Sequence, residues 1–166
     1  MLPIQPFGVS GESRMSAEPQ RIEVTLETLL ESVALAEEIG VRIAEAAGFD
    51  EDDRYKIGMA VREGVINAFQ YGNEQSREKK IRLVFELTPD KMVIHVLDQG
   101  LGFSLEDVAD PLAEENLMKA SGRGIFLMKA FMDEFDVRAA QPSGAEVIMA
   151  KNYRNAESRT RESHRR

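Results

Sequence analysis

The sequence predicts an α+β fold, a two-layer α/β sandwich in which a mixed, mostly antiparallel sheet carries helices on one face. Two observations support this prediction. Segments that alternate apolar and polar residues lie near the start, in the middle and near the end of the chain, as in strands. Segments with apolar residues at helical spacing lie between them. The predicted order is therefore strand, two helices, two strands, a loop, a helix and two strands.

The first strand and the first two helices are predicted between residues 21 and 71. Ile22, Val24 and Leu26 alternate with polar residues, which predicts a strand over residues 21–26. Residues 28–47 place apolar side chains every three or four positions, which predicts a helix. The acidic residues 50–52 suit the N-terminus of a second helix, because the helix dipole favours negative charge there. We expect this helix to run to about Tyr71.

The second half of the chain should supply the remaining strands and one helix. Residues 81–87 and 92–97 alternate, and Pro89-Asp90 between them predicts the tight turn of an antiparallel hairpin. The apolar period fails over residues 99–123, a long acidic loop of the kind that often forms a functional lid. The last predicted elements are a helix over residues 124–132 and two strands over residues 135–139 and 146–151.

Composition limits the class of protein. The net charge of −8 argues against general nucleic-acid binding, which depends on basic patches. No apolar run is long enough for a membrane span, and the absence of cysteine fits a cytoplasmic protein. A length of 166 residues suits one domain, which we assign to residues 21–151. Residues 1–20 are expected to be a flexible arm. Residues 152–166, with five arginines against two glutamates, are expected to be a basic disordered tail, or alternatively a docking segment.

A first polar cluster lies in the second predicted helix. Glu63 and Asn67 are four residues apart and therefore share one helix face, opposite the apolar stripe. The Asn67 carboxamide oxygen can ligate Mg²⁺, which prefers oxygen ligands. The Glu63 carboxylate can accept a proton from a hydroxyl or a water. The alternative interpretation, which the pair alone favours, is two polar residues on a solvated helix face.

A second cluster, Asp98-Gln99-Gly100-Leu101-Gly102, directly follows a predicted buried strand. An aspartate at a strand end can accept a hydrogen bond from an amino group, such as the exocyclic amine of adenine. Gly100 and Gly102 would let the backbone approach a flat ligand. The alternative interpretation is an ordinary turn at the end of a strand.

A third cluster, Gly122-Arg123-Gly124, lies at the start of the third predicted helix. Glycine-rich backbone at a helix start presents free N–H groups and the positive end of the dipole to phosphates. A hinge with a helix cap is the alternative. Other nucleotide motifs are absent from the sequence: there is no P-loop and no protein-kinase VAIK or HRD motif. Neither glycine pair extends to GxGxxG, because Leu105 and Leu127 occupy the third glycine position.

The three clusters occur in an order that resembles the Bergerat-fold GHKL ATPase superfamily, which includes histidine kinases, type II topoisomerases, Hsp90 and MutL. Within it, the chain is similar to the RsbW/SpoIIAB-type anti-sigma-factor serine/threonine kinases. The closer similarity rests on three stretches, residues 63–73 (EGVINAFQYGN), 122–128 (GRGIFLM) and 132–134 (MDE). It covers about residues 20–151.

The resemblance implies a site for Mg²⁺ and ATP. Asn67 would ligate Mg²⁺, and Asp98 would bind the adenine amine. Gly100 and Gly102 would shape the base pocket, whereas Gly122, Arg123 and Gly124 would hold the phosphates beneath the lid. Glu63 would be the general base that activates a serine. The sequence therefore contains all the residues that the resemblance assigns to the site: Asn67, the six other cofactor-binding positions and the catalytic Glu63.

The resemblance also implies partners. Such kinases phosphorylate a STAS-type anti-anti-sigma protein, sequester a sigma factor and are commonly homodimers. Two departures from the family are evident: a histidine usual near Gln70 is absent, and Ala145 replaces a threonine that helps to hold adenine.

Two other functions are alternatives to a protein kinase. One is a regulatory module that acts only by partner sequestration. The other is a histidine kinase core, which neither His95 nor His164 suits because neither lies on a predicted helix pair.

Overall fold

A five-stranded sheet forms one layer of the computed structural model, which describes residues 18–101 and 122–154. Every neighbouring pair of strands is antiparallel. The predicted α+β sandwich is confirmed, with a sheet that is antiparallel throughout the described residues rather than mixed. The strands, in the spatial order β1-β2-β3-β5-β4, are β1 (Gln20–Glu27), β2 (Lys80–Leu87), β3 (Lys91–Leu97), β5 (Ala145–Asn152) and β4 (Glu134–Ala139).

The central strands carry the largest apolar side chains of the core. Leu83 and Phe85 of β2 are fully buried, and they pair in register with Val96 and Ile94 of β3. This register follows from the alternating pattern, because a slip by one residue would turn the apolar set toward solvent. The predicted hairpin is therefore confirmed.

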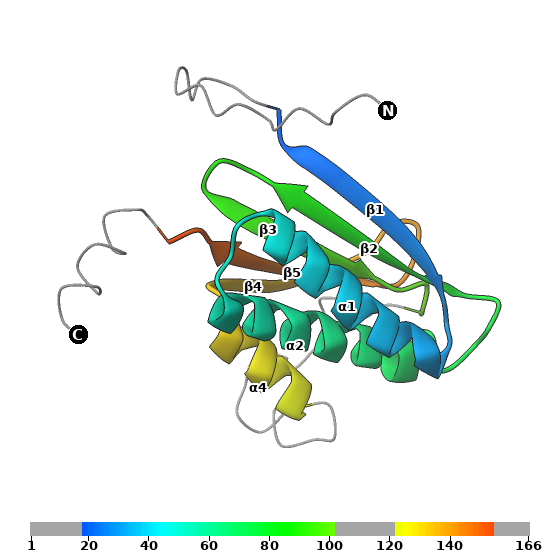
Figure 1. Cartoon of the computed structure of the whole chain (residues 1–166). Coiled ribbons are helices and arrows are strands. Elements are labelled where there is room, and N and C mark those ends of the chain that lie inside the picture. Colours follow the sequence, from blue (N-terminus) through cyan, green and yellow to red (C-terminus); the bar gives the residue numbers. More distant parts are fainter. Residues whose placement is uncertain (1–17, 102–121, 155–166) are drawn as a thin grey trace, which may run out of the picture.

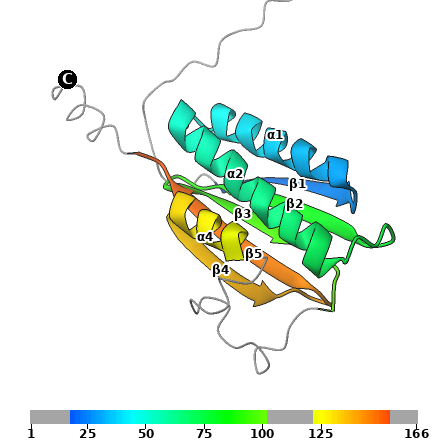
Figure 2. The ribbon, with the colours of Figure 1, turned by 90° about the horizontal axis from the view of Figure 1, so that it is seen from below.

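Three helices of the described residues cover one face of this sheet (Figures 1 and 2): α1 (Leu30–Ala46), α2 (Glu51–Asn67) and α4 (Gly122–Phe131). Helix α2 packs between α1 and α4. Its N-terminus is capped by Asp50, whose carboxylate accepts a hydrogen bond of 2.9 Å from the Asp53 amide. Ile57 and Val61 are fully buried, so the predicted apolar stripe of this helix meets the core.

The end of α2 differs from the prediction of an α-helix to about Tyr71. Residues Ala68–Gly72 form a π-helical turn, η1. The Asn73 amide closes it by donating a 2.7 Å hydrogen bond to the Ala68 carbonyl, five residues earlier. Turns of this kind are rare and occur frequently at functional sites. Periodicity alone did not reveal this one, because a single widened turn leaves the apolar spacing of α2 unchanged.

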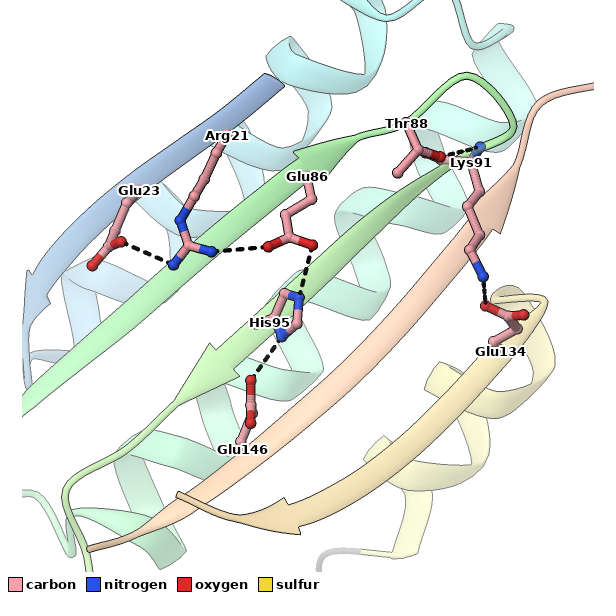
Figure 3. Close-up of polar contacts among 8 residues, drawn as sticks. All are labelled: Arg21, Glu23, Glu86, Thr88, Lys91, His95, Glu134 and Glu146. Atoms are coloured by element: carbon pink, nitrogen blue, oxygen red, sulfur yellow. Dashed lines mark hydrogen bonds and ion pairs between the residues drawn. The ribbon is translucent and has the colours of Figure 1, made fainter. Parts of the chain in front are cut away.

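The second face of the sheet carries a row of charged side chains that we call the open face (Figure 3). Arg21 of β1 binds Glu86 of β2, with 2.9 Å between Nη1 and Oε1. His95 of β3 lies between Glu86 and Glu146, and its Nδ1 is 2.7 Å from Oε1 of Glu146. These pairs connect four neighbouring strands through polar contacts.

Several predictions fall largely outside the described residues: the N-terminal arm (1–20), the lid (99–123), the basic tail (152–166) and Gly102. Helix α4 begins at Gly122, two residues before its predicted start, so the glycine-rich cluster forms its first turn. Among the described residues, no helix has both the length and the hydropathy needed to cross a membrane.

Candidate functional site

A pocket of about 450 Å³ opens between the helical layer and the ends of the central strands. Its walls are mainly apolar, with a few polar groups, as in most small-molecule sites. Among the predicted site residues that the structure describes, Asn67 and Asp98 line it. The apolar and aromatic part of the lining comes from α4, from η1 and from strands β3, β4 and β5, and includes Val96, Ile125, Met128, Phe135, Val137, Val147 and Tyr71.

The Asp98 carboxylate is held at the end of β3 by backbone amides. Its Oδ1 atom accepts hydrogen bonds from the amides of Gly100 at 2.9 Å and Ala145 at 3.1 Å. Only 8% of the residue is exposed. Because an ionised carboxylate can only accept hydrogen bonds, two amide donors on Oδ1 fix its orientation and leave Oδ2 as an acceptor for a ligand amine.

Glycines at three positions allow the backbone to close around Asp98. A Cβ atom at Gly72 would collide with the Asp98 carboxylate, and one at Gly100 would collide with the Gly72 carbonyl. Gly144, in the β4–β5 turn, has a φ of +96°, and a Cβ there would collide with the Asp98 backbone. Gly100 thus packs behind Asp98 and does not line the pocket itself.

Glu63 and Asn67 meet the first turn of α4. A Cβ built on Gly124 would lie 3.0 Å from Glu63 Oε2 and 3.5 Å from Asn67 Nδ2. The first and third sequence clusters are therefore adjacent, and the absence of a side chain at Gly124 allows this contact. Both Glu63 and Asn67 are half-buried, which is compatible with reaction at the edge of a pocket.

The first turn of α4 contains Gly122, Arg123 and Gly124. The first four N–H groups of a helix have no partner within it, so this turn offers donors to an anion. Arg123 is exposed. No group of three or more His, Cys, Asp or Glu side chains that could hold a metal ion occurs within residues 18–101 and 122–154. A cation here would depend on Asn67, on water and on ligand oxygens.

One buried polar residue beside the site was not predicted from the sequence. Asn73 is fully buried, and its side chain contacts the backbone at the end of β3. The sequence does carry a signal for this residue, because the pair Gly72-Asn73 ends the helix only a few residues after Asn67. The apolar side chains from β4 were also not assigned to the site, because their position depends on β5 lying between β3 and β4.

Most of the chain, including the candidate site, matches the model of a known protein family. Residues 26–151 match the family model described as a histidine kinase-like ATPase domain. This match includes Glu63, Asn67, Asp98 and the first turn of α4.

Individual relatives are similar over most of their length. The chain is 33% identical over 97 residues to an anti-sigma F factor of Clostridium perfringens, covering 57% of this chain and 69% of the relative. It is 29% identical over 152 residues to the serine-protein kinase RsbW of Staphylococcus epidermidis, covering 87% of this chain and 94% of the relative.

Proposed function

The chain belongs to the histidine kinase-like ATPase domain family, and on this premise we propose that it is an anti-sigma-factor-type protein serine/threonine kinase. One observation supports this most strongly. A carboxylate oriented by backbone amides lies in an apolar pocket, and the Glu63–Asn67 pair contacts Gly124 in the first turn of α4. This arrangement supports the proposal, because a base pocket, phosphate donors and a carboxylate base would then lie in one place.

Each residue then has a separate role toward ATP. Asp98 accepts a hydrogen bond from the adenine amine, and the apolar walls cover the base. The first turn of α4, with Gly122, Arg123 and Gly124, binds the phosphates through N–H groups and positive charge. Asn67 lines the pocket and is an oxygen ligand suited to Mg²⁺, which neutralises phosphate charge when bound.

Glu63 is the proton acceptor of the transfer step. The substrate hydroxyl gives its proton to the Glu63 carboxylate as its oxygen forms a bond to the γ-phosphorus. The bond from that phosphorus to the β–γ bridging oxygen breaks, and ADP leaves with the electron pair. In such reactions positioning and charge stabilisation supply most of the catalysis, and the base adds to them.

The names of the relatives support the choice of partners. The name anti-sigma F factor supports a sigma factor as the sequestered partner, and the name serine-protein kinase supports a protein serine as the phosphorylated residue. The proposed substrate is a serine or threonine of a STAS-type anti-anti-sigma protein. The kinase acts in the cytoplasm as a homodimer. Incubation with γ-labelled ATP and a candidate anti-anti-sigma protein tests this proposal, which requires label on the partner's hydroxyl.

A second candidate function is partner sequestration without catalysis. Ala145 favours it, because this residue lines the pocket with a methyl group where a hydroxyl would give one more hydrogen bond to the nucleotide. In that case ATP binding would persist and no label would reach the partner.

The first prediction concerns ATP itself. With Mg²⁺ present, ATP at about 100 times its Kd should add roughly 2.7 kcal/mol to the free energy of unfolding, because only the folded state binds it. Thermal melts with ATP, with ADP and with buffer alone measure this. Identical melting temperatures in all three would contradict the pocket assignment.

The second prediction concerns Mg²⁺. Asn67→Ala should keep the fold but lose the Mg²⁺-dependent part of ATP affinity, because the side chain faces the pocket rather than the core. Calorimetric titrations with Mg²⁺ and with EDTA separate the two parts. Gln70→Ala is the matched control, since it removes an exposed carboxamide from the next turn. Equal ATP affinity with and without Mg²⁺ in the wild type would rule out the ligand role.

A further inference from the structure

Asn73, at the end of η1, has a side chain whose oxygen and nitrogen are both hydrogen-bonded inside the protein. Its Oδ1 accepts a 2.7 Å hydrogen bond from the Gln99 amide. Its Nδ2 donates to Thr28 Oγ1 at 2.8 Å and to the Lys80 carbonyl at 3.0 Å. The residue has no exposed surface. These contacts reach three other segments: the β1–α1 junction, the start of β2 and the end of β3.

The contacts form a closed ring of three residues. Lys80 donates its amide hydrogen to Oε1 of the Gln99 side chain at 2.7 Å. Asn73, Lys80 and Gln99 are thus each bonded to the other two. Thr28 extends the ring, because its hydroxyl donates to the Lys79 carbonyl at 2.6 Å. A ring of this kind fixes the relative positions of its backbone segments better than separate hydrogen bonds do.

The ring lies next to the acceptor of the candidate site. Gln99 follows Asp98, and Gly72 precedes Asn73. These two backbone segments approach each other closely: Gly72 packs against the Asp98 carboxylate, and Gly100 packs against the Gly72 carbonyl. The Asn73–Gln99 hydrogen bond directly connects them. Asn73 therefore holds the backbone directly after Asp98, whose carboxylate the Gly100 and Ala145 amides orient.

We propose that Asn73 is a positioning residue for nucleotide recognition, which holds Asp98 where it accepts a hydrogen bond from the purine amine. Asn73 does not line the pocket, so it acts through the Gln99 amide and not on the ligand. This inference rests on the proposed ATP site. The carboxamide suits the role because it combines one acceptor with two donors, whereas aspartate lacks the donors and alanine lacks both.

The test compares Asn73→Ala with Thr28→Val. Asn73→Ala removes the bond to Gln99 and should weaken ATP binding about tenfold, the equivalent of one hydrogen bond. The preference for ATP over GTP should fall, and in a transfer assay KM for ATP should rise with little change in kcat. Thr28→Val removes a buried hydroxyl from the same network but leaves the Asn73–Gln99 bond, so it should lower the melting temperature without changing ATP affinity.

A conservative variant and a binding-independent measurement complete the design. Asn73→Asp keeps an acceptor for the Gln99 amide and should retain the preference for ATP despite lower stability. Hydrogen exchange of the Gln99 amide in nucleotide-free protein should be faster in Asn73→Ala than in Thr28→Val. If Asn73→Ala does not fold, Asn73→Ser replaces it, because the shorter hydroxyl cannot span the distance to Gln99.

Two results would overturn the positioning role: unchanged ATP affinity in Asn73→Ala, or an equal loss in Thr28→Val. Failure of the proposed ATP site gives a different result. In that case the wild-type protein would not bind ATP at all, and the positioning role would fall with it. A protein that binds ATP but transfers no phosphate would contradict the kinase function alone and leave the positioning role open to the binding tests above.

Discussion

Glu63→Gln is expected to lower the rate of phosphoryl transfer to the partner by about 10²–10⁴, the usual cost of losing a general base. Glutamine has the same size, so it fits the narrow space beside Gly124, where a Cβ would lie 3.0 Å from the Glu63 carboxylate. It cannot accept a proton at neutral pH. ATP and sigma-factor binding should therefore remain close to those of the wild type.

Single-turnover transfer from γ-labelled ATP to the anti-anti-sigma protein measures this effect. Glu38→Gln, an exposed position on α1, controls for the loss of one negative charge from the helical layer. A transfer rate within about threefold of the wild type would favour sequestration without catalysis.

Asp98→Asn should weaken ATP binding by about ten- to a hundredfold, which corresponds to the loss of one hydrogen bond to a charged group. The asparagine oxygen can still accept from the Gly100 and Ala145 amides, so the fold of the strand end should be kept. The NH₂ group then takes the place of Oδ2. Because it is a hydrogen-bond donor, it cannot accept the hydrogen bond from the adenine amine. The preference for ATP over GTP should decline with the affinity.

Calorimetric Kd values for ATP and GTP, with a melting curve for each variant, test this prediction. Asp90→Asn is the matched control, because Asp90 is exposed in the turn at the opposite end of β3. Equal ATP affinity in the wild type and Asp98→Asn would show that the carboxylate does not take part in recognition of the adenine base.

The order and type of the elements could be predicted because each depends on local spacing. The apolar alternation of β2 and β3 and the stripe through Ile57 and Val61 both correspond to buried faces. The pairing of β5 between β3 and β4 could not be predicted in this way, because it joins segments far apart in the chain. The apolar wall from Phe135 and Val137 depends on that pairing.

The site was predictable as far as single residues carry recognisable chemistry. Glu63 and Asn67 share a helix face by spacing alone, and Asp98 ends a strand. The contact of the first two with Gly124, and the ring around Asn73, are tertiary features of small or common residues that no local pattern distinguishes. The π-helical turn Ala68–Gly72, which lies between Asn67 and Asn73, was likewise not predicted from the sequence.

The open face and the pocket should respond differently to ionic strength. Pairs on the open face, such as Arg21–Glu86 and Lys91–Glu134 (Figure 3), have partly exposed side chains, and each contributes about 0–1 kcal/mol at most. At physiological ionic strength the Debye length is about 8 Å, and dissolved ions weaken the attraction between such exposed charges. Asp98 is instead held by short backbone hydrogen bonds in a buried setting that ions screen far less. We therefore expect salt to weaken the ion pairs on the charged side of the sheet and to leave the position of the Asp98 carboxylate unchanged.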